Sequence, residues 1–206
     1  MTQAAGVFVV DDEPELRRAL ERLLKTEGLR VQTYDSAASF LASLTPETWG
    51  CAVLDVAMPG IDGLSLQGRL AETDAALSIV FLTGHGDIPM SVRAIKAGAI
   101  DFLTKPVKSA ELLAAVRTAL ARSEAARTER RNTAEFRDRL ALLTPREHEV
   151  MTHVIAGKLN KIIAADLGTT EHTIKVHRGR VMEKLGVDSV AALVRFAQQL
   201  GIAAAG

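Results

Sequence analysis

Five polar residues stand where short apolar runs end in the first half of the chain. They are three carboxylates, a hydroxyl and an ammonium: Asp11, Asp12, Asp55, Thr83 and Lys105. Carboxylates that share one crevice repel each other unless a cation lies among them, and an all-oxygen ligand set suits Mg²⁺ rather than zinc. With the metal and a lysine neutralising phosphate oxygens, a carboxylate could attack a phosphoryl group in line and form an acyl phosphate.

Asp55 is the residue whose position most requires such a role. Residues 51–54 are apolar without alternation, which is typical of a central parallel strand covered on both faces. An unpaired carboxylate is costly at the end of such a strand. Taken singly, each of the five residues is more often a polar group that fixes a turn, but their joint occurrence favours a site with Asp55 as phosphoacceptor.

Alternating elements are needed to position these residues. Apolar runs at 7–10, 31–34, 51–56, 79–83 and 100–103 alternate with amphipathic segments. The pattern predicts an α/β fold with a doubly wound, parallel, five-stranded sheet of the flavodoxin-like kind. In such sheets the site lies outside the carboxyl ends of the strands, where all five residues stand.

Composition and charge narrow the class of protein. The 206 residues are 48% hydrophobic and 24% charged, which is ordinary for one large or two small globular domains. No apolar run reaches the ~18 residues of a membrane span, and the first residues lack a basic signal-like region, so we expect a cytoplasmic protein without a membrane partner. The single cysteine, Cys51, lies in a strand pattern and is expected in the core.

The two parts of the chain differ in charge. Residues 1–118 hold 11 Lys and Arg against 15 Asp and Glu, whereas residues 119–206 hold 14 against 10, which gives −4 and +4. An acidic first part and a basic second part suggest different partners.

The second part has the signals of short helices. Thr144, Pro145 and Glu147 form a capping box that begins a helix expected to stop at Gly157. Asn160 is expected to cap a second helix that ends at Gly168, followed by a third from Thr169 or Thr170 to Gly186 and a fourth capped by Ser189. Before them, residues 122–139 mix acids and bases without Gly or Pro, which favours a helical linker over a disordered charged one.

The second and third of these helices match a helix-turn-helix. On the third, Ile174, Val181 and Leu185 fall on one line and should face the core. The opposite face is basic, which suits DNA, although a solvated charged face is the other interpretation. The outward residues are His172, Lys175, Val176, Gly179, Arg180 and Glu183, with His177 and Arg178 at the borders.

Five motifs of the first part resemble the receiver domain of two-component response regulators: residues 10–13, 54–63, 82–87, 97–102 and 103–106. The resemblance implies that Asp55 is phosphorylated, that Asp12, Asp55 and the Ala57 carbonyl bind Mg²⁺, and that Asp11 acts through water. It also implies that Thr83 and Lys105 contact the phosphate, that Phe102 is a rotamer switch and that the Lys105–Pro106 bond is cis. Ala57 offers no polar side chain to orient water and His85 could crowd it, unless His85 is simply an exposed loop residue, so we expect a long-lived acyl phosphate.

Residues 143–197 resemble the LuxR-type DNA-binding domain of the NarL/FixJ class, through 160–168, 173–178 and 181–186. The resemblance implies base contacts by Lys175 and Val176, and backbone contacts around Asn160, Lys161, Thr170 and His177. Two residues depart from the family's pattern. Ile162 stands where the family commonly has an acidic residue, and Gly179 stands where it often has a longer side chain. The full expected DNA-binding set is Asn160, Lys161, Thr170, Thr173, Lys175, Val176, His177, Gly179 and Arg180.

Together these patterns predict a response regulator rather than an enzyme, with a receiver at 1–121, a helical linker at 122–139 and a helix-turn-helix domain at 140–206. Its expected partners are a histidine kinase, promoter DNA and, after phosphorylation, a second copy of itself. Two alternatives stay open: a phosphorylation-independent regulator with a degenerate receiver, and an aspartate-based phosphohydrolase. The latter requires a second aspartate two residues after the nucleophile, where this chain has Ala57.

Overall fold

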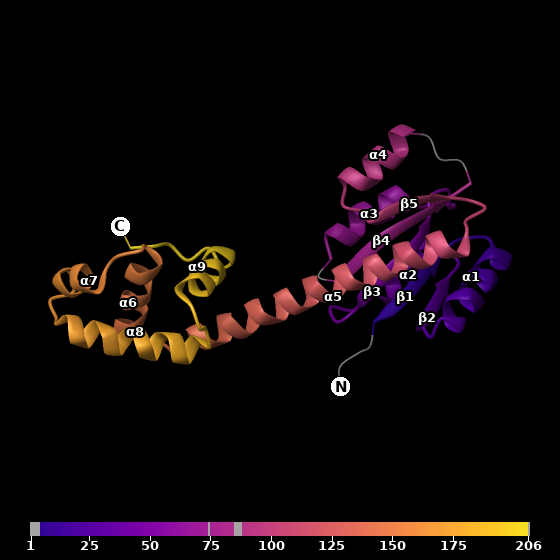
Figure 1. Cartoon of the computed structure of the whole chain (residues 1–206). Helices are drawn as coiled ribbons and strands as arrows, with labels where there is room; N and C mark the ends of the chain where they lie inside the picture. The colour runs from indigo at the N-terminus through magenta and orange to yellow at the C-terminus, as the bar shows by residue number, and fades with distance from the viewer. Residues whose placement is uncertain (1–4, 74, 85–87, 206) are drawn as a thin grey trace. The chain divides into compact units, whose positions relative to one another are not determined.

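The computed structural model describes residues 5–73, 75–84 and 88–205. The chain forms two compact units, Met1–Thr128 and Glu129–Gly206, and each is considered by itself. The first unit is an α/β sandwich and the second is entirely helical (Figure 1). The predicted fold class is thereby confirmed.

The first unit contains one parallel sheet with strand order β2-β1-β3-β4-β5. Helices cover both of its faces (Figure 1). Its strands are β1 (Gly6–Val10), β2 (Val31–Tyr34), β3 (Trp49–Asp55), β4 (Ala76–Thr83) and β5 (Asp101–Thr104), and its helices are α1 (Pro14–Thr26), α2 (Ala37–Ser43), α3 (Gly63–Ala71), α4 (Ile88–Lys96) and α5 (Ser109–Leu140).

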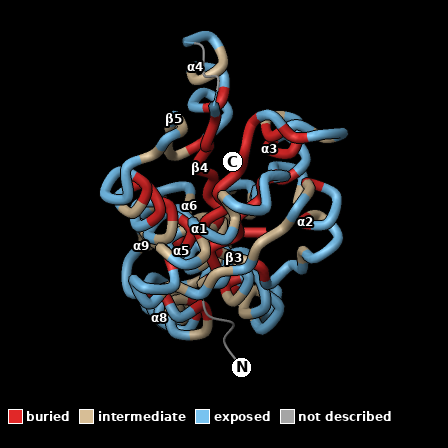
Figure 2. The backbone as a smooth tube through the Cα atoms, turned by 90° about the vertical axis from the view of Figure 1, so that its right-hand side faces the viewer, coloured by how far each residue is buried: buried red, intermediate tan, exposed pale blue. Residues whose placement is uncertain are grey.

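Two apolar layers explain why the strands are apolar throughout. Successive side chains of a strand point to opposite faces, so Phe8 and Val10 pack in one cluster with α2, α3 and α4, while Val7 and Val9 pack in the other with α1 and α5. Strands β3 and β4 are almost wholly buried. The red colour of β4 is visible in Figure 2. Cys51 is a core residue as expected, and burial raises the pKa of its thiol.

Helix α5 is continuous over its 32 residues, so residues 122–139 are helical, as the lack of Gly and Pro predicts. In the first unit, the buried Ser123 hydroxyl accepts a hydrogen bond from the Gly50 N–H at 2.7 Å and donates to the Ala76 carbonyl. In the second unit, Phe136 is 2% exposed and stacks on Phe196 at 4.9 Å between ring centroids. The boundary between the two compact units, after Thr128, falls inside the expected linker, and the domain bounds stay predictions.

The second unit is built from α6 (Pro145–Ile155), α7 (Asn160–Asp166), α8 (Glu171–Leu185) and α9 (Val190–Gln199), with the end of α5. The capping box at Thr144 is confirmed, as are the N-caps Thr170 and Ser189. The prediction for Asn160 is wrong: Leu159 occupies the N-cap position without a side-chain cap, and Asn160 is the first helical residue. The Asn160 carboxamide instead accepts a hydrogen bond from Arg178 of α8, at 3.1 Å.

Glu147 ties α6 to α8 in the interior of the second unit. Its carboxylate is 4% exposed, accepts from the Thr144 N–H at 2.8 Å and pairs with the Lys184 ammonium at 2.6 Å. These interactions lower the pKa of Glu147 from 4.5 to about 2, the hydrogen bond from Lys184 being the largest cause. A depressed carboxyl pKa contributes stability above the unfolded-state value, and that stability is lost as the pH falls toward the folded value.

Glu147→Gln keeps the side-chain shape and a capping oxygen but removes the charge. We expect this change to cost the second unit on the order of 2 kcal/mol at neutral pH, and to flatten its loss of stability between about pH 5 and pH 2. Amide hydrogen exchange of α6 and α8 measures this stability locally. Glu149→Gln, which removes an exposed carboxylate of the same helix, is the control. Equal pH dependence in the unmutated and Glu147→Gln proteins would contradict the assignment.

Candidate phosphoacceptor site and DNA-binding surface

The carboxyl edge of the sheet brings the expected site residues together. Strand register sets Val10 beside Leu54, so Asp11 and Asp55 follow side by side. Carboxylate oxygens of Asp11, Asp12 and Asp55 all lie within 4.8 Å of one another. The Lys105 ammonium is 2.7 Å from Asp11 Oδ2 and 3.1 Å from Asp55 Oδ1, so one cation bridges two buried acids.

The protein's own donors hold Asp11 in place. Its Oδ1 accepts from the Glu13 N–H at 2.8 Å and its Oδ2 from Lys105, while its backbone carbonyl accepts from Arg17 at 2.6 Å. The side chain of Asp12, in contrast, is exposed and has no hydrogen bond or ion pair within the described part of the chain. Asp12 is thus the acid most available to a cation. Arg17 had no signal in the sequence, since its contact depends on how α1 turns back over the loop.

Burial and charge oppose one another at Asp55 and Lys105. Burial raises the pKa of the Asp55 carboxyl above its usual value, although Lys105 acts to lower it. Burial would lower the pKa of Lys105, but hydrogen bonds and charge attraction from Asp11 and Asp55 outweigh it and the pKa lies above its usual value. Lys105 therefore stays charged at neutral pH, and Asp55 depends on neighbouring cations to stay ionised.

Thr83 and Phe102 lie beside this cluster. Thr83 ends β4 with 1% exposure, and its carbonyl accepts from the Lys105 N–H at 2.7 Å. Phe102 of β5 is partly buried, with its ring 5.9 Å from that of Phe81. The expected cis Lys105–Pro106 bond is present.

Ala57 lies just after β3 and is exposed. Its backbone carbonyl accepts no hydrogen bond from any residue that the structure describes, which leaves it able to bind a cation. His85, the other residue expected to affect water near the phosphate, lies outside the described residues, and its role stays a prediction.

Helix α8 presents the expected outer surface. Ile174, Val181 and Leu185 are at most 1% exposed and form the inner line, as predicted. Among the expected DNA contacts, three are half-buried, namely Asn160, Thr173 and His177, and six are exposed, namely Lys161, Thr170, Lys175, Val176, Gly179 and Arg180. The Thr170 hydroxyl accepts from the Thr173 N–H at 3.2 Å, so its oxygen already caps α8.

An acidic site at the carboxyl edge of a doubly wound sheet, carried with a separate helix-turn-helix unit, defines a signal-receiving DNA-binding protein. Comparison with known families agrees. Residues 7–117 match the response regulator receiver domain, and residues 141–197 match the bacterial regulatory proteins of the luxR family.

Known relatives cover nearly the whole chain. Nodulation protein W of Bradyrhizobium diazoefficiens is 46% identical over 97% of this chain and 88% of its own length, and the transcriptional regulatory protein FixJ of Azorhizobium caulinodans is 42% identical over 100% and 97%. The solved structure of the response regulator StyR is similar with a TM-score of 0.78 and 44% identity, covering 96% of this chain and 100% of that one. The chain belongs to the family of two-component response regulators with a LuxR-type DNA-binding domain.

The hydrogen bond from Arg178 orients the side-chain amide of Asn160. Because the Asn160 oxygen accepts from Arg178, its amide N–H groups are left to donate outward, where a DNA phosphate could accept them. Arg178→Ala should weaken binding to selected and random DNA duplexes to a similar extent, about tenfold, without altering discrimination between them. Fluorescence anisotropy with DNA selected by the unmutated protein measures both affinities.

Arg137→Ala removes an equal charge from an exposed position on α5 and is the control for net charge. A loss confined to the selected sequence would show instead that Arg178 acts on base recognition. An equal loss of DNA affinity in Arg137→Ala would show that the effect of Arg178→Ala comes from the change in net charge alone.

Proposed function

We propose that a histidine kinase transfers a phosphoryl group to Asp55 with Mg²⁺ bound, and that phosphorylation promotes dimerisation and promoter binding. The observation that carries this proposal is the Lys105 ammonium shared by Asp11 and Asp55, beside the Asp12 carboxylate, which has no partner among the described residues. Such a cluster favours a dianionic phosphoryl group, which adds acceptor oxygens next to fixed positive charge.

The donor set fits Mg²⁺, because it consists of carboxylate oxygens close together, with Asp12 exposed to water, and of the carbonyl oxygen of exposed Ala57. Asp12, Asp55 and the Ala57 carbonyl would hold the ion, with Asp11 acting through water. When bound, Mg²⁺ would neutralise phosphate oxygens during transfer.

The chain's own residues supply the remaining chemistry. An Asp55 oxygen attacks phosphorus as the phosphohistidine nitrogen leaves, so one P–O bond replaces one P–N bond. Lys105 stabilises the transferred oxygens, and the Thr83 hydroxyl donates to one of them. Exposed Ala57 presents no side-chain base to activate water, which favours slow hydrolysis and argues against a phosphohydrolase. The complete cluster argues against a degenerate receiver.

An apolar stripe on α4 supports a homodimer. Ile88, Val92 and Ile95 are 80%, 44% and 46% exposed, and their spacing places them along one side of the helix. Helix α4 packs against β5, the strand that carries Phe102 (Figure 1). Movement of Thr83 toward the phosphate would let Phe102 turn inward and alter this surface. A second copy that covers the stripe would bring two DNA-binding units to paired half-sites.

On DNA we propose that Lys175 and Val176 of α8 meet base edges, while the other expected contacts hold phosphates. Their exposure on the outer face of α8 supports this assignment. Within the described ranges no helix has the length and apolar character to cross a bilayer. We place the protein's action in the cytoplasm, where promoter DNA lies.

Asp55→Asn tests the switch, because an amide cannot form the acyl phosphate. Acetyl phosphate with Mg²⁺ should raise both the dimer fraction and the DNA affinity of the unmutated protein, and should change neither in Asp55→Asn. Analytical ultracentrifugation and DNA titration measure the two responses. Asp62→Asn is the control, since it alters an exposed carboxylate that caps α3. Identical DNA-binding curves for the unmutated and Asp55→Asn proteins would leave the degenerate-receiver alternative standing.

Lys175→Ala tests base recognition. We expect a loss of about 1–3 kcal/mol in binding to the selected sequence and a smaller loss on random DNA, because a base contact adds to the phosphate term. Competition titrations at two salt concentrations separate the two terms. Lys161→Ala, an expected phosphate contact, should weaken both duplexes alike. Unchanged discrimination in Lys175→Ala would remove this residue from base recognition.

A further inference from the structure

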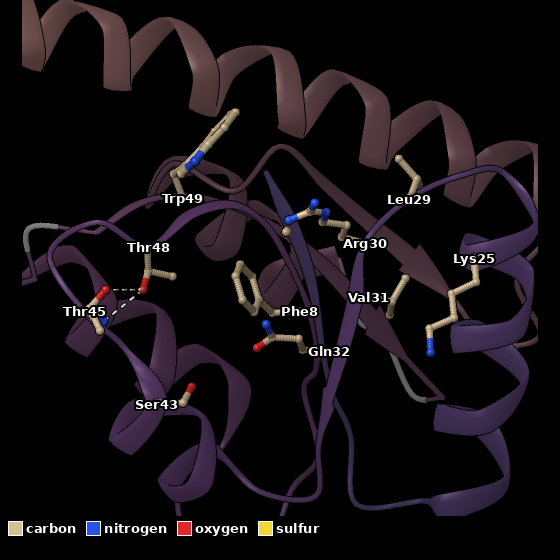
Figure 3. Close-up of a pocket in the computed structure, with 11 residues that line it drawn as sticks. Phe8, Lys25, Leu29, Arg30, Val31, Gln32, Ser43, Thr45, Thr48 and Trp49 are labelled. Carbon is tan, nitrogen blue, oxygen red and sulfur yellow. Dashed lines mark hydrogen bonds between the residues drawn. The ribbon is translucent and has the colours of Figure 1, made fainter. Parts of the chain in front are cut away.

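A hollow of about 460 Å³ lies at the amino ends of β1, β2 and β3 (Figure 3). Asp55 is at the other end of β3, so the hollow and the phosphoacceptor cluster lie at opposite edges of the sheet. Its volume is within the range of small-molecule sites. The hollow is lined by residues of three strands, the end of α1, the end of α2 and the segment before β3: Gly6, Phe8, Lys25, Leu29, Arg30, Val31, Gln32, Ser43, Thr45, Thr48 and Trp49.

The charged groups of this lining are cations. Lys25 and Arg30 belong to it, and no Asp or Glu does among the residues that the structure describes. Lys25 is already paired with Glu21 at 2.6 Å, whereas Arg30 makes no side-chain hydrogen bond or ion pair with any described residue. Figure 3 shows the Arg30 guanidinium directed into the space between Phe8 and Trp49. Within the described part of the chain, Arg30 therefore brings to the hollow a positive charge that has no partner.

Neighbouring polar groups add donors rather than acceptors. The Gln32 carbonyl oxygen accepts from the Tyr34 hydroxyl at 2.7 Å, so its amide N–H groups remain to donate. The Thr48 oxygen accepts from the Thr45 N–H at 2.9 Å, and the two hydroxyls lie 3.2 Å apart. Whichever of these hydroxyls donates to the other, the second keeps a hydrogen with no acceptor among the residues that the structure describes.

Aromatic surface completes the hollow. Phe8 is almost buried, and Trp49 carries the Arg127 guanidinium 4.7 Å from its ring centroid. A ligand that matches this lining has an anionic group rich in acceptors and a small flat apolar body.

We propose that this hollow is a second binding site of the first unit, which takes a small organic anion with a carboxylate on a compact apolar body. The Arg30 guanidinium binds the carboxylate, with Gln32 and the Thr45–Thr48 pair as further donors. The apolar body packs against the aromatic surface of the lining. The site shares none of its lining residues with the phosphoacceptor cluster, so the proposal of this site does not depend on the proposed phosphorylation.

Trp49 provides a direct probe, because it is the one tryptophan of the sequence. Its indole N–H resonance in the full-length ¹⁵N-labelled protein should shift saturably on titration with benzoate. Benzamide, which has the same shape without the charge, should cause no saturable shift. Inorganic phosphate, which lacks the apolar body, should bind at least tenfold more weakly than benzoate.

Two substitutions test whether Arg30 is the cation that binds the carboxylate. Arg30→Gln should weaken benzoate binding at least tenfold, whereas Arg18→Gln, which removes an exposed cation of α1 outside the lining, should leave it unchanged. The proposal is overturned if benzoate causes no shift, if benzamide causes an equal shift, or if phosphate binds as tightly as benzoate. It is also overturned if Arg30→Gln still binds benzoate as the unmutated protein does, or if Arg18→Gln loses as much affinity as Arg30→Gln.

Discussion

The first unit is organised around the cost of placing carboxylates at the end of a buried sheet. Asp11 and Asp55 are 2% and 5% exposed, and charges at such depth are unfavourable unless they are paired. The Lys105 ammonium lies between the two carboxylates and offsets part of this unfavourable free energy. Because Lys105 reaches the site from the end of β5, two strands away from β3, the electrostatics depend on the order β1-β3-β4-β5 being correct. Charge and topology are therefore linked in this unit.

The need to pair buried carboxylates also explains why the three acids differ in their surroundings. The oxygens of Asp11 are taken up by protein donors, and Asp55 shares Lys105, so their positions are set before any ligand arrives. Asp12 is left exposed. A site whose buried members are fixed and whose outer member is open can bind a cation and a phosphoryl group with little reorganisation, which is what electrostatic preorganisation requires.

Sequence reasoning succeeded where the physics is local or repeats along the chain. The unbroken apolar runs identify the strands, the acids at their ends lie together as expected, and Thr144 with Glu147 identifies the start of α6. It failed for Asn160, whose side chain is an ordinary capping residue by type. The competing interaction comes from Arg178, eighteen residues further along, and no local pattern reveals it. The Arg17 contact to the Asp11 carbonyl escaped prediction for the same reason.

In the second unit, a buried carboxylate links two helices. The Glu147 carboxylate pairs with Lys184 at 2.6 Å and also forms the capping box with Thr144, so the start of α6 and the end of α8 are fixed relative to each other. Breaking such a pair by removing one partner leaves a charge without compensation, which costs more than the pair contributes. Asn160 and Arg178 then join the start of α7 to the middle of α8 through a neutral acceptor, which leaves the cationic face of α8 unneutralised. Glu147 therefore stabilises the interior of this unit, while its outer helix face keeps the positive charge that DNA requires.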